Sequence, residues 1–211
     1  MKQYRLEDVN LGEYGNPIIP IEIKRQTPLT PKGMETVFNG REAIKAILDG
    51  RDPRKLVIFG PCSVHDEKSY KEFVERTLPL TAKYRDKMVI VARAYMEKPR
   101  TRKGWRGFIV DPNLKGEVNY REGYRRAREL LVYVADHGLP IATEFLDVNT
   151  PNILDDTVTW AAIGARTVEV NEHRGMVSGL SMPVGMKNNT AGNFLKAIDA
   201  VVTASKPDEF P

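Results

Sequence analysis

The sequence has little cysteine and no long apolar run, and each absence excludes a class of protein. Cys62 is the only cysteine among 211 residues, so no intrachain disulfide can form and we expect a reducing, cytoplasmic location. No run approaches the ~18 apolar residues of a membrane span. The first residues, Met1 to Glu7, lack the apolar core of a secretory signal. We therefore expect no membrane association.

The two signs of charge are nearly balanced. Lysine plus arginine number 32 and aspartate plus glutamate number 28, which gives a net charge of +4. So small an excess argues weakly for anionic ligands and does not suggest nucleic acid, which usually requires a concentrated basic face. Hydrophobic residues make up 41% of the chain, enough for a soluble domain to bury a core.

The first 33 residues are polar and rich in turn-forming residues, and they predict an arm outside the core. A segment with helical spacing follows from Glu35 to Asp49, and Gly50 is well placed to end it. We therefore divide the chain into an N-terminal arm and helix, residues 1–50, and a second domain, residues 51–211.

From residue 55 onward, short apolar runs alternate with helical segments. The predicted strands cover residues 55–59, 88–92, 140–144, 162–168 and 183–187. Short buried strands that alternate with helices pair in parallel, because parallel neighbours need crossover connections. The pattern predicts the α/β class and a (β/α)₈ barrel of the TIM-barrel type, with only about five of its eight strand–helix units present.

Polar or reactive side chains recur where the predicted strands end, namely Cys62, Arg93, Glu144, Arg166 and Lys187. The carboxyl ends of barrel strands form the mouth of the active site. A lone buried cysteine is more often a small hydrophobe, and a lone strand-end lysine or arginine is usually just exposed. Five strand ends of this kind are nevertheless hard to explain by core packing, so we expect a site at this edge.

A basic stretch follows the second predicted strand. It runs from Lys98 through Arg106 and contains Trp105. A solvated loop explains such charges about as well as a ligand site does, and a nucleic-acid patch explains them less well. Arginine suits phosphate groups because its planar fork makes two charge-assisted hydrogen bonds at once. The sharper interpretation is therefore the capture of a phosphorylated substrate.

Four motifs carry a family resemblance, and they are Gly60–Ser63, Glu97–Thr101 with Gly104 and Trp105 after it, Trp160–Thr167, and Ser178–Asn188. Together they resemble the 3-deoxy-D-arabino-heptulosonate-7-phosphate (DAHP) synthases, the first enzymes of the shikimate pathway. The resemblance covers residues from about 35 to 205. It implies an aldol-type transferase that condenses phosphoenolpyruvate with erythrose 4-phosphate.

The resemblance also implies a set of substrate contacts. These residues are Arg93, Lys98, Pro99, Arg100, Thr101, Glu144, Ala165, Arg166 and Lys187. Arg93, Lys98, Arg166 and Lys187 would hold phosphoenolpyruvate. Residues 99–101 would face the phosphate of erythrose 4-phosphate. Glu144 would orient water or a basic side chain near the phosphate of phosphoenolpyruvate. Lys98 would in addition be the catalytic proton donor.

By the same resemblance, Cys62 is a ligand of a divalent metal such as Mn²⁺ or Fe²⁺. The family's other three ligands, a histidine, a glutamate and an aspartate, lie on later strands and loops, and no histidine here matches that motif. The metal site is therefore expected to be incomplete in this chain. Two short segments, residues 169–171 and 189–192, depart from the family pattern.

The chain ends at Pro211, about where the family's sixth strand begins, so we expect a C-terminally truncated member. Three possibilities stay open: half of a split enzyme that needs a complementing C-terminal fragment, a non-catalytic binding or homo-oligomerisation module, or a product without stable function. The alternative enzyme is the related 8-phosphate octulosonate synthase. The resemblance also implies control by an aromatic amino acid, since the N-terminal arm lies where the family builds effector and oligomer contacts.

Overall fold

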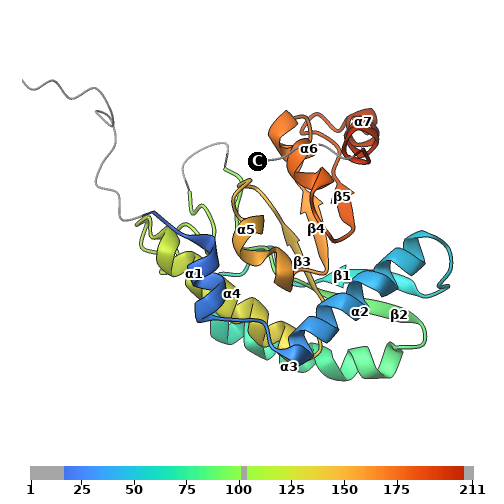
Figure 1. Ribbon diagram of the computed structural model, residues 1–211, viewed down its shortest axis with the longest axis horizontal. Coiled ribbons are helices and arrows are strands. Elements are labelled where there is room, and N and C mark those ends of the chain that lie inside the picture. The colour runs from blue at the N-terminus through green and yellow to red at the C-terminus, as the bar shows by residue number, and fades with distance from the viewer. Residues whose placement is uncertain (1–16, 101–103, 207–211) are drawn as a thin grey trace, which may run out of the picture.

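A single parallel sheet organises the protein (Figure 1). The structure, a computed structural model, describes residues 17–100 and 104–206. The strands are β1 (Lys55–Phe59), β2 (Met88–Arg93), β3 (Ile141–Glu144), β4 (Trp160–Ile163) and β5 (Val184–Met186). Each pairs in parallel with the next one in sequence, in the order β1-β2-β3-β4-β5. The predicted α/β class with five parallel strands is confirmed.

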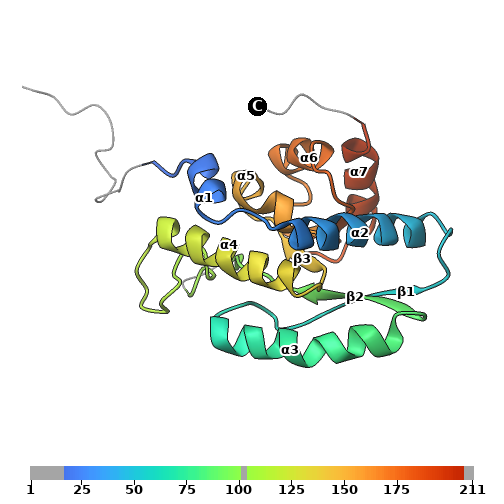
Figure 2. The ribbon, with the colours of Figure 1, turned by 60° about the horizontal axis from the view of Figure 1, so that its bottom comes forward.

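Helices connect and flank the strands. They are α1 (Pro20–Gln26), α2 (Pro31–Leu48), α3 (Glu67–Tyr84), α4 (Tyr120–Asp136), α5 (Pro151–Leu154), the 3₁₀ helix η1 (Asp155–Thr157), α6 (Asn171–Ser178) and α7 (Leu195–Ala204). In Figures 1 and 2, α3 and α4 lie side by side along β2 and β3, whereas α6 and α7 lie beside β4 and β5. In the described part of the chain no helix is long and apolar enough to cross a membrane.

Side chains at the helix starts explain why the three longest helices begin where they do. The Thr30 hydroxyl accepts a hydrogen bond from the backbone N–H of Gly33, the Asp66 carboxylate from Ser69, and the Asn119 side chain from Glu122. Each bond satisfies a helix N–H group that has no partner within the helix. The caps fix the entry points of α2, α3 and α4 relative to the strands before or after them.

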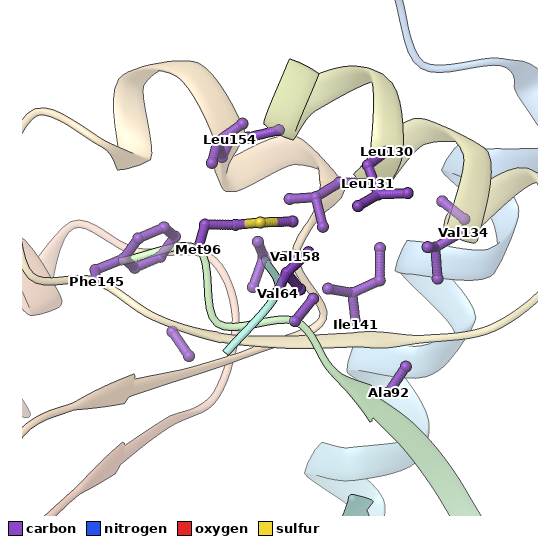
Figure 3. Close-up of a cluster of buried hydrophobic side chains, with 14 of the residues drawn as sticks. Val64, Ala92, Met96, Leu130, Leu131, Val134, Ile141, Phe145, Leu154 and Val158 are labelled. Carbon is purple, nitrogen blue, oxygen red and sulfur yellow. The ribbon is translucent and has the colours of Figure 1, made fainter. Parts of the chain in front are cut away.

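The main core fills the space between α4 and one face of the sheet. In Figure 3, leucine and valine side chains of α4 point toward Ile141 of β3 and Ala92 of β2. Leu131, Val134, Ile141 and Ala92 have no solvent exposure. At about 25 cal/mol for each Å² of apolar surface buried, this layer is the main favourable contribution to folding.

The other face of β2 is covered by α2. Val89 and Val91 alternate with Ile90 and Ala92, so they point to the opposite side of the sheet. There they pack against Ile44 of α2, which is completely buried. Because both faces of β2 are covered, its sequence is a continuous apolar run up to Arg93, as is typical of central parallel strands.

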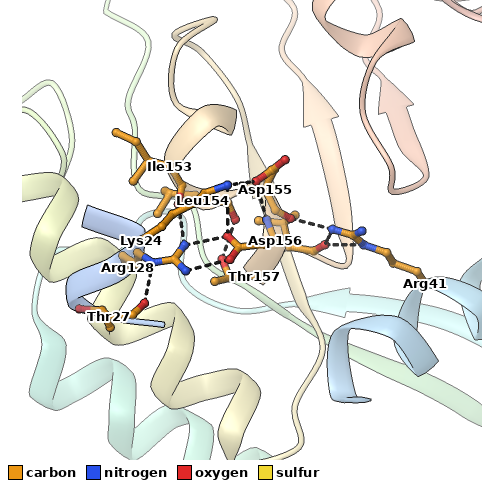
Figure 4. A network of polar contacts seen from close by, with 10 residues as sticks. Lys24, Thr27, Arg41, Arg128, Ile153, Leu154, Asp155, Asp156 and Thr157 are labelled. Atoms are coloured by element: carbon orange, nitrogen blue, oxygen red, sulfur yellow. Dashed lines mark hydrogen bonds and ion pairs between the residues drawn. The ribbon is translucent and has the colours of Figure 1, made fainter. Parts of the chain in front are cut away.

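The prediction of an arm outside the core is wrong for residues 18–30. This segment forms α1 and then leads into α2, and Ile23 is only 3% exposed. In Figure 4, Arg128 of α4 donates from Nε to the Thr27 carbonyl (2.8 Å) and forms a bidentate pair with Asp156. Lys24 pairs with Asp155 at 2.8 Å. Contacts with residues more than a hundred positions away therefore anchor the segment.

The fourth strand also differs from its prediction. Residues 162–168 were expected to be extended, but β4 begins at Trp160 and ends at Ile163. The chain then turns, because the Gly164 carbonyl accepts the N–H groups of Thr167 (3.1 Å) and Val168 (3.0 Å). Arg166 consequently lies in a turn beyond the carboxyl end of the strand.

Candidate active site

The predicted site residues gather at the carboxyl edge of the sheet, where the loops after β1 and β2 meet. Lys98 donates from Nζ to the Cys62 sulfur at 2.8 Å, and Arg93 donates from Nη2 to the Cys62 carbonyl at 3.3 Å. The hydrogen bond from Lys98, followed by its charge, lowers the pKa of the Cys62 thiol below its ordinary value, and the charges of Arg93 and Arg100 act the same way. Two predicted cations, Lys98 and Arg93, thus contact the predicted residue Cys62.

Two glycines allow the backbone to come this close. Gly60 has φ +153°, and a Cβ atom there would come within 2.8 Å of the Arg93 carbonyl oxygen. Gly107 has φ +107°, and a Cβ atom there would meet the backbone of Glu97 and Lys98 at 2.7 Å. Both positions combine an unfavourable backbone angle with missing space, so only glycine is compatible with them.

Glu144 and Lys187 pair across the site from β3 and the end of β5. The Lys187 ammonium lies 2.5 Å from Oε2 of Glu144, whose side chain is only 6% exposed. Lys187 is itself held through its backbone, which donates to the Ile163 carbonyl at 3.1 Å. The expectation that Glu144 orients a basic side chain agrees with this geometry, although its relation to a substrate stays a prediction.

Tyr95 links the two cationic groups. The guanidinium carbon of Arg93 lies 4.0 Å from the centre of the Tyr95 ring, and the ammonium of Lys187 lies 5.2 Å from it. The side chain is buried, and burial, with the nearby charge of Glu144, raises the pKa of the Tyr95 hydroxyl to about 12. Sequence reasoning missed this residue, although its position two places after Arg93 marks it as lying on the same side of the extended chain.

A cavity of about 760 Å³ opens beside this cluster. Its walls include Lys98, Pro99 and Arg100 from the loop after β2, and Arg166 from the turn after β4. Four of the predicted substrate-binding residues therefore face one space. The size suits a small molecule. The lining holds four cations, Lys98, Arg100, Arg106 and Arg166, against three acidic residues, Glu97, Asp147 and Glu172, and this excess of positive charge favours an anion.

Hydrogen bonds within the loop that carries Lys98 and Arg100, and others to a neighbouring loop, fix its backbone. Within it, the Lys98 N–H donates to the Arg106 carbonyl (3.0 Å) and Arg100 donates from Nε to the Trp105 carbonyl (2.7 Å). From outside, the buried carboxyl group of Glu97 accepts the N–H groups of Leu146 (3.1 Å) and Asp147 (3.3 Å). The Lys98 side chain is thus presented by a fixed backbone.

Glu97 is the second residue that sequence reasoning missed, although it stands in the Glu97–Thr101 motif. Burial raises the pKa of its carboxyl group to about 8, and the two backbone hydrogen bonds only partly oppose this. His173 is a third. It lines the cavity and donates from Nε2 to the Leu146 carbonyl (2.7 Å), while its Nδ1 is buried and has no partner within residues 17–100 and 104–206.

The structure says little about two of the predicted substrate contacts, Ala165 and Thr101. Ala165 lies beside Arg166 in the turn after β4, and its position is compatible with a backbone contact to a ligand. Thr101 lies outside the described residues. The remaining predicted residues form two groups. One group lies around Tyr95 and Lys98 and consists of Cys62, Arg93, Glu144 and Lys187. The other group lines the cavity and consists of Lys98, Pro99, Arg100 and Arg166.

The described residues do not form a metal site by themselves. Over residues 17–100 and 104–206, no group of three histidine, cysteine or acidic side chains could hold a metal ion. The sulfur of Cys62 faces the ammonium of Lys98, which is a cation and not a second ligand. The role of Cys62 as a metal ligand therefore stays a prediction.

The cationic side chains lie at the carboxyl edge of a partial parallel barrel, which is where α/β proteins of this architecture bind their ligands. Residues 19–210 match the profile of the DAHP synthetase I family. The chain is 44% identical over 207 residues to the Phe-sensitive phospho-2-dehydro-3-deoxyheptonate aldolase of Escherichia coli K12, and 42% identical over 210 residues to the Tyr-sensitive enzyme of that strain. The chain belongs to the DAHP synthetase I family.

A solved structure agrees with this assignment. The phospho-2-dehydro-3-deoxyheptonate aldolase of Francisella tularensis SCHU S4 is 43% identical and superposes with a TM-score of 0.91 over 94% of this chain. The expected partial barrel of the TIM-barrel type is thereby confirmed. The chain spans 59% of the length of the two Escherichia coli relatives and 58% of the Francisella chain.

Proposed function

We propose that this chain contributes the phosphoenolpyruvate-binding part of a DAHP synthase, which condenses phosphoenolpyruvate with erythrose 4-phosphate to give DAHP and phosphate. The observation that supports this most strongly is the convergence of three cations, Arg93 and Lys98 at and after the end of β2 and Lys187 after the end of β5. Their positive charges would offset the repulsion between two anionic substrates.

The chemistry assigns each group a simple task. Arg93, Lys187 and Arg166 hold the phosphate and carboxylate of phosphoenolpyruvate, and carbon 3 of this substrate attacks the aldehyde of erythrose 4-phosphate. Water adds at carbon 2, and phosphate leaves as its carbon–oxygen bond to carbon 2 breaks. Lys98 contacts Cys62, as Arg93 does, so it can reach the same substrate, and it donates a proton to the developing alkoxide oxygen. Arg100, in the wall of the cavity, receives the phosphate of the second substrate.

Further parts of the proposal concern the setting of the enzyme. The two Escherichia coli relatives are named for their sensitivity to phenylalanine and tyrosine, which supports control by an aromatic amino acid.

A divalent metal such as Mn²⁺ would polarise the aldehyde, with Cys62 as one ligand and the others from outside the described residues. A cytoplasmic location, and either a homo-oligomer or a complementing C-terminal segment, complete the proposal. The relatives' names do not favour 8-phosphate octulosonate synthesis.

Calorimetric titration of phosphoenolpyruvate into the 211-residue chain tests the proposed site. Lys187→Met should weaken binding at least about tenfold, which corresponds to about 1.4 kcal/mol. Lys45→Met is a matched control, because Lys45 also pairs with one glutamate and has a similar side-chain exposure, 46% against 42% for Lys187. Equal affinities of the two variants would contradict the assignment.

A turnover assay tests the reaction itself. The chain is mixed with Mn²⁺, phosphoenolpyruvate and erythrose 4-phosphate, with and without a separately supplied C-terminal barrel segment of the family. Heptulosonate should form only in the presence of the added segment. Preference for arabinose 5-phosphate over erythrose 4-phosphate would instead identify the octulosonate reaction.

A further inference from the structure

Arg93 has an unusual environment for a partly buried cation. Its Nε atom is buried and has no hydrogen-bond partner among the residues that the structure describes, and its Nη2 atom donates to the Cys62 carbonyl at the long distance of 3.3 Å. Among the described residues no carboxylate forms an ion pair with it. What holds the guanidinium is the ring of Tyr95, 4.0 Å from its central carbon.

A ring and a carboxylate hold an arginine in different ways. A carboxylate bonds to the N–H groups in the guanidinium plane and so occupies the donors that an oxyanion would use. An aromatic ring attracts the face of the guanidinium through its quadrupole and leaves these in-plane donors available. The unpartnered Nε of Arg93 is the donor that this arrangement preserves.

The same ring also attracts Lys187, whose ammonium lies 5.2 Å from its centre. Two cations that approach a common ligand repel each other, and the ring lowers the free energy of holding both. The ring itself is held in place, because the Tyr95 carbonyl accepts the Val64 N–H (2.9 Å) and the preceding Ala94 N–H bonds to the Ala142 carbonyl (2.8 Å). Tyr95 is 7% exposed.

We propose that Tyr95 is a positioning residue of the phosphoenolpyruvate site, whose ring face holds Arg93 and Lys187 ready for an oxyanion while leaving the Nε donor of Arg93 unoccupied. This inference rests on the proposed function, because it takes phosphoenolpyruvate as the ligand. The hydroxyl group takes no part. It stays protonated at neutral pH, since burial raises its pKa to about 12, and it forms no hydrogen bond with another described residue.

Two variants of Tyr95 separate the ring from the hydroxyl group. In calorimetric titrations of phosphoenolpyruvate into the full chain, Tyr95→Phe should bind within about twofold of the unaltered chain, and Tyr95→Leu about five- to thirtyfold more weakly. Tyr133→Leu is the matched control, because the Tyr133 ring also holds a cation, Lys71 at 4.9 Å, but lies outside the site. A loss in Tyr95→Phe equal to that in Tyr95→Leu would overturn the role of the ring.

Phenylalanine with one, two or three ring fluorines at position 95 keeps the shape of the side chain and weakens only its quadrupole. Affinity for phosphoenolpyruvate should fall with each fluorine, and a flat series would overturn the inference even if Tyr95→Leu fails to fold. Lys187→Met distinguishes this inference from the proposed function. If it weakens binding while the fluorine series is flat, only the inference about Tyr95 fails. If the unaltered chain does not bind phosphoenolpyruvate, the proposed function fails as well.

Discussion

Replacing Glu97 with glutamine tests how the burial of one carboxyl group controls the pH dependence of stability. Glu97 is 7% exposed and accepts two backbone N–H groups from the loop after β3. Burial raises its pKa from 4.5 to about 8. Glutamine has nearly the same size but cannot ionise, so the variant removes the titration and leaves the packing.

The magnitude follows from the difference between the two pKa values. The folded protein keeps a proton on Glu97 at pH values where the unfolded chain has lost it. The contribution of Glu97 to the free energy of unfolding is therefore fully present below pH 4.5 and is lost as the pH rises toward 8. At about 1.4 kcal/mol per pKa unit the total loss is about 5 kcal/mol, of which roughly 3 kcal/mol falls between pH 5 and pH 8. This is a large share of the stability of a typical domain, about 5–15 kcal/mol.

Urea unfolding at fixed pH values between about 4.5 and 9 measures the effect. The unaltered chain should lose roughly 3 kcal/mol more than Glu97→Gln between pH 5 and pH 8. Glutamine accepts only one of the two N–H groups, which lowers its stability by about 1 kcal/mol at every pH and does not alter the slope. Parallel curves for the two proteins would refute the reasoning.

Two further outcomes are expected. Lys98→Met should raise the pKa of the Cys62 thiol, because Lys98 provides the main hydrogen bond that stabilises the thiolate. Alkylation by iodoacetamide reports on the only cysteine, and its pH midpoint should move upward. An unchanged midpoint would contradict this. Arg128→Ala should lower the free energy of unfolding by about 3–5 kcal/mol, because it leaves Asp156 and two carbonyl groups without their buried partner. Arg125→Ala, on the same helix but in surface ion pairs, should cost at most about 1 kcal/mol in urea unfolding, and equal losses for the two arginines would contradict this.

The strands were predictable because parallel strands covered on both faces are continuous apolar runs. The predicted strand 55–59 coincides with β1, and 88–92 misses only the last residue of β2. The end of β4 was not predictable, since Val168 continues the apolar pattern although hydrogen bonds to the Gly164 carbonyl fold the chain into a turn. Local apolarity reports burial, and Val168 is buried without being extended.

The N-terminal segment was misjudged for a different reason. Its short helix carries little local signal, and what fixes it lies elsewhere: Lys24 meets Asp155, and Arg128 meets the Thr27 carbonyl. Such pairings depend on the whole fold, so no pattern within residues 18–30 reveals them.

The candidate site was foreseen as a set of strand-end residues and motif positions, but not as a set of contacts. The pairing of Lys187 with Glu144, 43 residues away in sequence, was expected only in general terms. The contribution of Tyr95 was not foreseen, because a buried tyrosine in a strand extension resembles any core residue until the cations over its ring are located.

The network of Figure 4 has a consequence for how the protein matures during synthesis. Each strand pairs with the next one in sequence, so the sheet can grow one strand at a time as the chain leaves the ribosome. The bonds from Arg41 to the Val158 carbonyl and from Arg128 to the Thr27 carbonyl join residues 117 and 101 positions apart. Helix α1 contacts both α4 and α5, so its packing is complete only after these later elements have been translated.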